Sequence, residues 1–392
     1  VRTDESSFFE GWVFSEGQGI AYYNFGTVLR VEPTEFGAIK PVEKWNLSKQ
    51  RNNATSKGYD ASKIRNFGYQ NGKLYCVYNN NQIKVLNAQT GEDLGNLKKG
   101  SIVKGGNLEL SDVKCFQNHI VACNRALPGE EFRVYVWDDD TKEPYLLYNT
   151  NEFGSMASIG DCLDVAQNCN FDTNLWLNFC SDTGSKTTVL EFHRNSSGVW
   201  SRYEVNVTSD GTNYFHTGAN ARAYPNGGVW WIDGNACQPT YFVRCSNGIQ
   251  PSKTHPVANE TWGGSHHEFT YRGNVYTIAP VFDDRIEGNT DSYYKGGKMR
   301  LELLTNYNYA KLYDRGYYPA EGLGDVQNPD CTADCMFNTD KQTYGELWVF
   351  STNQGIAYYA WGDVPPQNPE PVEILTPTIT ASASSLNFET TA

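Results

Sequence analysis

Long apolar runs and basic residues are scarce in this sequence. No apolar run reaches the roughly 18 to 20 residues that a membrane-spanning helix needs, so we expect no membrane span. Lys and Arg number 32 against 45 Asp and Glu, which gives a net charge of −13. Because binding to phosphates requires a basic face, this charge argues against nucleic acids and anionic membranes as partners. Val1 begins without a charged region and an apolar segment, so we expect any export signal to lie outside this sequence.

The common catalytic and cofactor motifs are missing as well. The sequence holds no G-x-G-x-x-G, no phosphate-binding P-loop, no G-x-S-x-G elbow and no His-x-x-x-His pair. The segment 181–184 has part of a sialidase Asp-box but lacks its Trp and its spacing. We therefore expect a non-enzymatic protein with no catalytic residues and no cofactor. A carbohydrate-active hydrolase or lyase stays open, because its two carboxylates would come from different repeats and would form no motif.

What the sequence has in abundance is aromatic residues. Tyr, Phe and Trp number 25, 19 and 10, while Met is reduced to 3. Aromatic residues favour strands, and long stretches of helix-forming residues are missing. The composition predicts an all-β protein.

The two ends of the chain carry nearly the same segment. Residues 10–26 read EGWVFSEGQGIAYYNFG and residues 346–362 read ELWVFSTNQGIAYYAWG, with twelve of 17 positions identical at an offset of 336. Each copy has two apolar stretches around a polar turn, which is the pattern of a β-hairpin. Self-similarity at both ends favours a closed repeat architecture with Trp12 and Trp348 in neighbouring positions.

Five further pairs of short apolar stretches lie between these ends. They are 72–78 with 82–86, 118–123 with 132–137, 174–179 with 188–192, 228–232 with 240–243, and 273–279 with 299–304. Together with the end copies they make seven units, so we predict a β-propeller of seven blades over residues 1–363. The uneven spacing leaves six or eight blades open, because an end copy can complete another blade.

The unit that begins at Gly72 resembles a known blade pattern. Its Gly-Lys-Leu-Tyr start, its second strand and the segment Asn-Ala-Gln-Thr-Gly-Glu over 87–92 are similar to blades of WD40-like and PQQ-like propellers. The resemblance implies the propeller fold. The functions of those families do not carry over with it.

A change of composition follows the predicted propeller. Residues 364–376 are rich in Pro and predict an extended linker. The segment 377–388, PTITASASSLNF, resembles the first strand of the immunoglobulin-like (BACON-like) modules in surface proteins of Bacteroidota. The resemblance implies that residues 377–392 open a further domain of the same chain.

The cysteines are even in number and several are close in sequence. We expect four local disulfides, Cys115 with Cys123, Cys162 with Cys169, Cys237 with Cys245 and Cys331 with Cys335, which leaves Cys76 and Cys180 to pair or to stay reduced. Reduced core thiols are the alternative. Disulfides indicate an oxidising compartment, so we expect a secreted or cell-surface protein.

Metal binding has little support in the pattern. The adjacent residues of His266-His267 would point to opposite faces of a strand, so both rings are not expected to bind one metal. Three acidic clusters leave calcium open: 138–140, Asp283-Asp284 with Glu287, and Asp330 with Asp334. None of them matches a calcium-binding loop motif.

Two long loops around one repeat unit form the candidate ligand site. The segment 252–267 carries Trp262, His266 and His267, and the segment 282–298 carries Asp283, Asp284, Tyr293 and Tyr294. Loops supply binding residues more often than strands do, and aromatic rings suit sugar rings or protein anchors. Solvated loops with no ligand are the alternative.

Taken together, these patterns predict an extracellular recognition or adhesion module that binds a glycan or a surface protein. Two other classes remain open. A hydrolase or lyase would show perturbed carboxylates in a central pocket, whereas a structural subunit of a surface filament would contact copies of itself.

Overall fold

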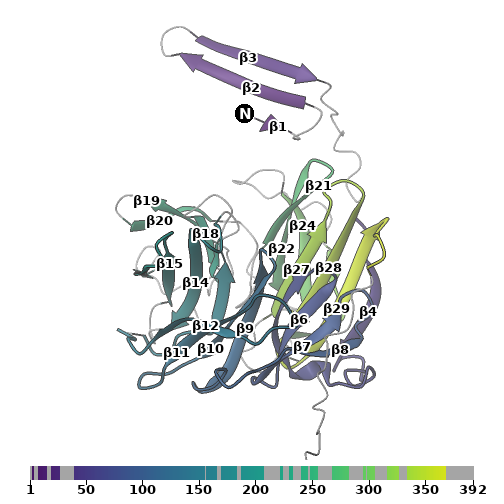
Figure 1. Ribbon diagram of the computed structural model, residues 1–392. Coiled ribbons are helices and arrows are strands. Elements are labelled where there is room, and N and C mark those ends of the chain that lie inside the picture. Colours follow the sequence, from purple (N-terminus) through teal and green to yellow (C-terminus); the bar gives the residue numbers. More distant parts are fainter. Residues whose placement is uncertain are drawn as a thin grey trace, which may run out of the picture.

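The structure is a computed structural model (Figure 1). It describes the backbone of residues 2–3, 8–15, 19–26, 39–154, 156–165, 169–182, 187–206, 221–223, 229–232, 240–245, 248–254, 267–281, 295–296, 298–304, 316–325 and 333–367. Side chains are described for residues 39–154, 156–165, 169–179, 190–203, 269–273, 276, 278, 318–324 and 337–367.

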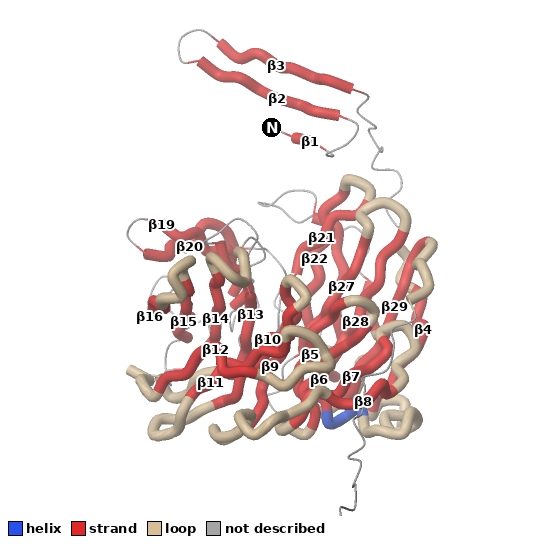
Figure 2. The backbone as a smooth tube through the Cα atoms, in the orientation of Figure 1, coloured by secondary structure: helices blue, strands red, loops and turns tan. Residues whose placement is uncertain are grey.

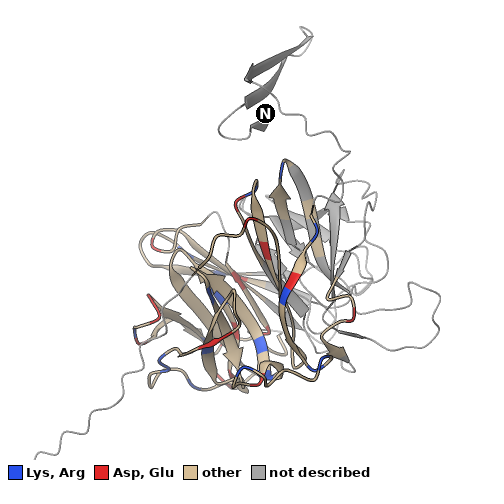
Figure 3. Ribbon diagram, turned by 90° about the vertical axis from the view of Figure 1, so that its right-hand side faces the viewer, with Lys and Arg blue, Asp and Glu red and all other residues tan. Residues whose placement is uncertain are grey.

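The described chain is all-β, as the composition predicted. Its one helical element is the 3₁₀ turn η2, Ala61–Lys63. Within the described residues no helix is long or apolar enough to cross a membrane. Basic and acidic residues are interspersed along the described strands (Figure 3).

Six antiparallel sheets have four strands each, and we number them in chain order. Sheet 1 contains β5 (Ile64–Gln70), β6 (Lys73–Tyr78), β7 (Gln82–Asn87) and β8 (Asp93–Asn96). Sheet 2 contains β9 (Leu108–Phe116), β10 (His119–Arg125), β11 (Phe132–Trp137) and β12 (Tyr145–Thr150). Sheet 3 contains β13 (Cys162–Val165), β14 (Leu175–Asp182), β15 (Thr187–Arg194) and β16 (Trp200–Asn206).

The remaining three four-stranded sheets follow in the same way. Sheet 4 contains β17 (Ala221–Ala223), β18 (Val229–Ile232), β19 (Thr240–Cys245) and β20 (Gly248–Thr254). Sheet 5 contains β21 (His267–Tyr271), β22 (Asn274–Val281), β24 (Lys298–Leu304) and β25 (Gly316–Tyr318). Sheet 6 contains β27 (Ala333–Thr339), β28 (Tyr344–Ser351), β29 (Gly355–Gly362) and β4 (Val42–Ser48).

Two smaller sheets complete the described strands. One contains β1 (Arg2–Thr3), β2 (Phe8–Ser15) and β3 (Gly19–Gly26), and the other pairs β23 (Lys295–Gly296) with β26 (Gly324–Asp325).

All five internal hairpins predicted from the sequence are confirmed, since each predicted pair forms the second and third strands of one sheet. Local turn chemistry also joins the first two strands of several sheets. In sheets 1, 2 and 5 the first two strands are joined by two residues that both have positive φ: Asn71-Gly72, Gln117-Asn118 and Arg272-Gly273. Two such residues in succession define the type I′ turn, whose twist matches that of the paired strands.

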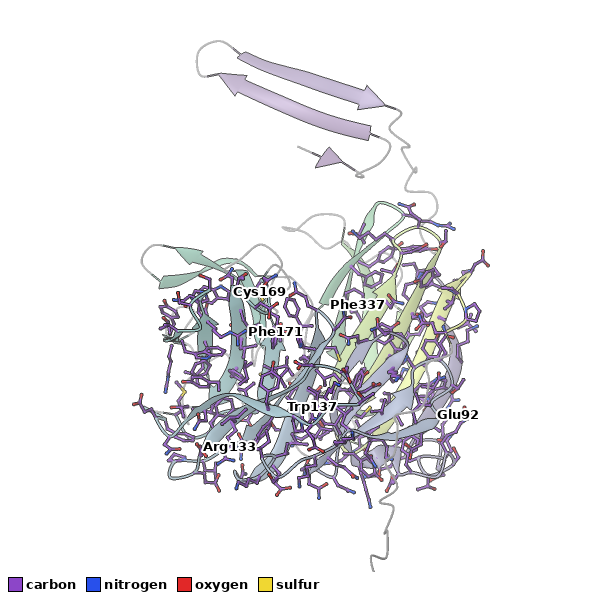
Figure 4. All side chains as sticks on the ribbon, in the orientation of Figure 1. Glu92, Arg133, Trp137, Cys169, Phe171 and Phe337 are labelled. Carbon is purple, nitrogen blue, oxygen red and sulfur yellow. The ribbon has the colours of Figure 1, made fainter. Side chains whose placement is uncertain are left out.

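Neighbouring sheets pack face to face through apolar cores. Sheets 1 and 2 share a core with Trp137, and sheets 2 and 3 share one with Phe171; both residues are labelled in Figure 4. Sheets 6 and 1 share the core around Trp348, and sheets 5 and 6 share the core around Leu347. The first strands β5, β9, β13 and β17 lie in succession, and β27 lies beside β5. The described loops gather at the two ends of these sheets (Figure 2).

Sheet 6 combines strands from distant parts of the chain. Its outermost strand β4 pairs antiparallel with β29, so that Asn46 lies opposite Ala357 and Trp45 lies opposite Tyr358. The side chain of Trp12 is outside the described residues, so the expected proximity of Trp12 to Trp348 stays a prediction. The hairpin predicted at each end of the chain is present, as β2–β3 and as β28–β29.

The predicted disulfide between Cys115 and Cys123 is wrong in this structure. Cys115 lies opposite Ile120, whereas Cys123 lies opposite Asp112, three residues further along the same strand pair. An odd separation sends the two side chains to opposite faces of the sheet. Cys123 accordingly lies in the core with sheet 3, and Cys115 packs against the core with sheet 1.

The other predicted disulfides have different outcomes. Cys162 and Cys169 are both buried and are not bonded to each other, and the register places Cys162 opposite Cys180 instead. Cys237 and Cys331 are outside the described residues, and Cys245 and Cys335 are described in their backbone alone. The pairs Cys237 with Cys245 and Cys331 with Cys335 therefore stay predictions.

Candidate functional site: the polar face of sheet 3

The ligand site predicted from the sequence falls largely outside the described residues. Six of its seven residues are outside the described part of the chain: Trp262, His266, Asp283, Asp284, Tyr293 and Tyr294. His267 is the first residue of β21, opposite Ile278, and its side chain is not described. The prediction that these residues form one site stays a prediction.

Within the described residues, sheet 3 has two faces of very different chemistry. One face contributes Leu175, Leu177 and Phe179 of β14 and Leu190 and Phe192 of β15 to the core with sheet 2. Because side chains alternate along a strand, the residues between them belong to the other face. Those residues are Trp176 and Asn178 of β14 and Glu191 and His193 of β15, with Tyr203 of β16 opposite Glu191. We call these five residues the polar face.

Three aromatic rings stack on the polar face. The Trp176 and His193 rings have centroids 3.9 Å apart and an angle of 11° between their planes. Tyr203 stacks on Trp176 from two strands away, at 6.1 Å and 24°. Trp176 and His193 are half-buried and Tyr203 is 42% exposed, so the group presents aromatic surface to solvent.

Asn174 holds two of these rings in position. Its side-chain oxygen accepts a hydrogen bond from Trp176 Nε1 at 3.0 Å and lies 2.8 Å from His193 Nε2. An amide oxygen has no proton to give, so Nε2 is the protonated nitrogen of His193. The backbone of Asn174 is itself fixed by two hydrogen bonds with Asn170. The stacked rings are therefore pre-organised by a turn that precedes β14.

The polar face also carries hydrogen-bonding groups behind the rings. Glu191 is 2% exposed and Asn178 is 1% exposed, and the register places Asp164 of β13 opposite Asn178. Buried polar groups require partners in the folded protein. Aromatic faces beside a few fixed amide and carboxylate groups are the combination that small-molecule sites use for stacking and orientation.

A second polar group joins the first strands of sheets 1, 2 and 3. Asp112 on β9 accepts hydrogen bonds from Lys114 Nζ at 2.8 Å and from the backbone N–H of Leu163 at 2.7 Å. Asp161 pairs with Arg125 and accepts a hydrogen bond from Ser158 at 2.6 Å. Both carboxylates are thus already engaged by cations and donors, so we assign this cluster to holding the three sheets together.

Arg65 on β5 lies close to the same carboxylates. Burial lowers the pKa of its guanidinium, and the charges of Asp161 and Asp112 oppose that shift. Its Nε has no hydrogen-bond partner among the described residues. The interaction of Arg65 with this cluster is therefore electrostatic.

Three described carboxyl groups have a resolved pKa shift. Where a pKa shift is resolved, at Glu131, Asp139 and Asp340, it is downward. The causes include hydrogen bonds from Asn149 to Glu131 and from Thr141 to Asp139, which favour the charged forms. General acid catalysis near neutral pH requires the opposite shift.

The acidic cluster at 138–140 does not converge on one point. Asp138 faces His119 at 3.3 Å, Asp139 accepts hydrogen bonds from Thr141 in its own turn, and Asp140 pairs with Lys73. Among the described residues no group of three or more His, Cys, Asp or Glu side chains is arranged to hold a metal ion. The clusters at Asp283 and Asp330 lie outside those residues, so calcium binding there stays open.

The sequence did contain a signal for the polar face. Residues 174–179 alternate Asn, Leu, Trp, Leu, Asn and Phe, and residues 190–193 alternate Leu, Glu, Phe and His. A strict period of two with Trp, His, Asn and Glu in the polar positions marks a face that is not a conventional core. The hairpin pattern of these segments predicts the two strands but assigns no ligand site to their second face.

Comparison with known proteins establishes the fold of the chain but not its function. Neither a protein-family model nor a curated protein sequence matches it. Among solved structures the chain is similar to a DUF4623 family protein from Bacteroides eggerthii, with a TM-score of 0.64 and 14% sequence identity. The similarity covers 92% of this chain and 84% of that one. At this identity the likeness shows a shared fold alone.

Proposed function

We propose that the chain is a secreted or cell-surface β-propeller that recognises a glycan and has no catalytic activity of its own. The observation that carries this proposal is the stack of Trp176, His193 and Tyr203 on the polar face of sheet 3. Indole and phenol rings combine a flat apolar surface with a polar edge, which suits the apolar face and hydroxyl groups of a sugar ring.

The propeller with six blades is supported by how the sheets are built and packed. Four of the four-stranded sheets are made of consecutive strands, sheet 5 skips β23 alone, and the sixth borrows β4 from near the other end. Radial repetition of four-stranded sheets is the defining feature of propellers. On this proposal the C-terminal copy forms the sixth blade together with β4, and the N-terminal copy lies in a separate three-stranded sheet, so the predicted seven blades become six.

The proposal favours binding over catalysis for a chemical reason. Hydrolysis of a glycosidic bond requires a carboxylic acid that stays protonated near neutral pH, next to a second carboxylate. The described carboxyl groups with resolved shifts have lowered pKa values, and Asp112 and Asp161 are bound to cations.

Glycan-array screening of the purified chain tests the proposal. We expect binding to a defined set of glycans, and a loss of at least about tenfold in affinity, or ~1.4 kcal/mol, for Trp176→Ala. Trp45→Ala is the matched control, because Trp45 is also half-buried and packs on another ring, Tyr358, but lies in sheet 6. Equal losses in both variants would show that the polar face is not the site.

An assay of the bound glycan separates recognition from catalysis. After incubation with the wild-type chain we expect no new reducing ends and no unsaturated sugars. Appearance of either product would replace the proposed recognition role with that of a hydrolase or a lyase.

A further inference from the structure

The small sheet of β1, β2 and β3 repeats three strands of sheet 6 in pairing register as well as in sequence. Shifting its pairs by 336 positions converts Arg2 opposite Glu10 into Asn338 opposite Glu346, and Trp12 opposite Tyr22 into Trp348 opposite Tyr358. The correspondence runs to the far end of the hairpin, where Ser15 lies opposite Gly19 as Ser351 lies opposite Gly355. We call β1–β3 the N-terminal triplet and β27–β29 the C-terminal triplet.

The C-terminal triplet binds β4 through residues that the N-terminal triplet also has. Tyr358 packs on Trp45 of β4 with ring centroids 5.9 Å apart, and the Tyr359 hydroxyl donates to Glu43 at 2.9 Å. The same two tyrosines stand at positions 22 and 23 in β3. The side-chain types with which β29 holds β4 therefore occur in β3, in the same order.

The C-terminal triplet also has specific contacts with sheet 1. Trp348 stacks on Tyr69 at 4.5 Å, and Phe350 meets Phe67 edge to face at 5.3 Å. Glu346 is fully buried and accepts a hydrogen bond from Gln89 at 3.1 Å. The corresponding residues at 10, 12 and 14 are again Glu, Trp and Phe. These three side-chain types are thus present in both triplets, whereas Asn338, which donates to the Tyr69 hydroxyl at 3.2 Å, has Arg2 as its counterpart.

The chain connects the N-terminal triplet to β4 directly. The segment 27–41 joins the end of β3 to the start of β4, whereas β29 meets β4 after most of the chain has intervened. Antiparallel strands that are close in sequence pair with a small loss of chain entropy. Pairing β3 with β4 would complete a four-stranded sheet in simple sequence order, as in sheets 1 to 4.

Differences between the triplets explain why β4 pairs with β29 in the structure. Leu347 is 1% exposed in the core between sheets 5 and 6, and Gly11 stands in its place in the N-terminal triplet. Replacing a buried leucine by a residue without a side chain removes apolar contacts and leaves a cavity. The C-terminal triplet is therefore better suited to this position than the N-terminal triplet.

We propose that β4 has two docking edges in the same chain, β29 and β3, and that the N-terminal triplet competes with the C-terminal triplet for one position next to sheet 1. The exchange would also release the segment after β29. Gln89 holds that segment through Pro365 at 2.9 Å and through the backbone of Gln367 at 2.8 Å, and Gln367 contacts Glu346 of the C-terminal triplet.

Pairs of introduced cysteines in the full chain report which edge β4 occupies. Asn46→Cys with Ala357→Cys reports pairing with β29, and Asn46→Cys with Ala21→Cys reports pairing with β3, because Ala21 corresponds to Ala357. Mild oxidation and peptide mapping by mass spectrometry measure each link. Asn46→Cys with Asn24→Cys is the control, since position 24 is out of register by three residues.

We expect the 46–357 link to dominate and the 46–21 link to exceed the 46–24 control at least fivefold within a single chain. Leu347→Gly should raise the yield of the 46–21 link, and so should Gly11→Leu. Each variant makes the two triplets more similar in the apolar packing they offer at this position. Trp12→Ala should abolish it without lowering the melting temperature, which separates loss of pairing from loss of folding.

Two results would overturn the proposal. A 46–21 link that stays at the level of the control in wild-type, Leu347→Gly and Gly11→Leu chains would show that β3 does not bind β4. A link found between differently tagged chains alone would assign the β3 edge to a second copy instead.

Discussion

The indole N–H of Trp348 donates a hydrogen bond to the backbone carbonyl oxygen of Ala88 over 2.7 Å, and both residues are fully buried. Trp348 belongs to β28 and Ala88 follows β7, so this bond joins sheet 6 to sheet 1. It is one of the contacts through which residues 260 positions apart in the sequence become neighbours.

Trp348→Ala should destabilise the protein by about 3–5 kcal/mol, because a large buried ring is lost and the Ala88 carbonyl loses its donor. Trp12→Ala removes the equivalent residue of the N-terminal triplet and should cost much less while that triplet is the minor occupant. Urea unfolding followed by fluorescence measures both. If the two variants lost the same free energy of unfolding, the C-terminal triplet would not be the stronger occupant.

Cys115 and Cys123 should both be alkylated in denaturant without any reductant. In the native protein neither should react, because burial raises the pKa of each thiol and keeps it from the reagent. Mass spectrometry after iodoacetamide treatment distinguishes the two states. If labelling in denaturant required prior reduction, the two cysteines would be in disulfides and the register of β9 with β10 would be in doubt.

The charged side chain of Asp340 should stabilise the protein at neutral pH, and this stabilisation should be lost in acid. Desolvation opposes ionisation of this carboxyl, but hydrogen bonds from Thr343 and from the backbone of Gln342 and Tyr344 outweigh it and hold the pKa well below its usual range. Because the folded pKa is depressed, the stabilisation is present above the unfolded pKa of about 3.9 and is lost as the pH falls below it.

The variant that checks this is Asp340→Asn. Its melting temperature should lie below that of the wild type at pH 7, and the difference should shrink as the pH falls below about 4, because the carboxyl group of the unfolded chain then becomes protonated while that of the folded protein is still ionised. A difference that is independent of pH would mean that the charge of Asp340 is not what stabilises the turn.

The loop site predicted from the sequence and the polar face of sheet 3 make opposite predictions for the same glycan. If the polar face is the site, Trp262→Ala with Tyr293→Ala should leave affinity unchanged, whereas Trp176→Ala should weaken it. If the loops are the site, Trp262→Ala with Tyr293→Ala should abolish binding with nearly the same melting temperature as the wild type, and Trp176→Ala should leave affinity unchanged. Titration calorimetry on the two sets of variants decides between them.

Most of the candidate site could not be predicted from the sequence, because it depends on the register between strands. Trp176, His193 and Tyr203 lie on three strands, and their stacking depends on which residues the register brings opposite each other. The two-residue alternation around Trp176 identifies a polar strand face, but it does not say what lies on the next strand. Trp262 is predicted as a ligand residue from the glycines that follow it, which are a local feature of the sequence.

The strands and hairpins of this protein follow from local features of the sequence, because turn residues such as Asn71-Gly72 and alternation along a strand act over a few residues. The sequence also predicts that the two ends of the chain form the same hairpin. The place of β4 in sheet 6 and the opposite cores of Cys115 and Cys123 could not be predicted in this way and are seen in the folded structure. Strand register and sheet packing depend on contacts between residues far apart in the sequence, so a local pattern does not specify them.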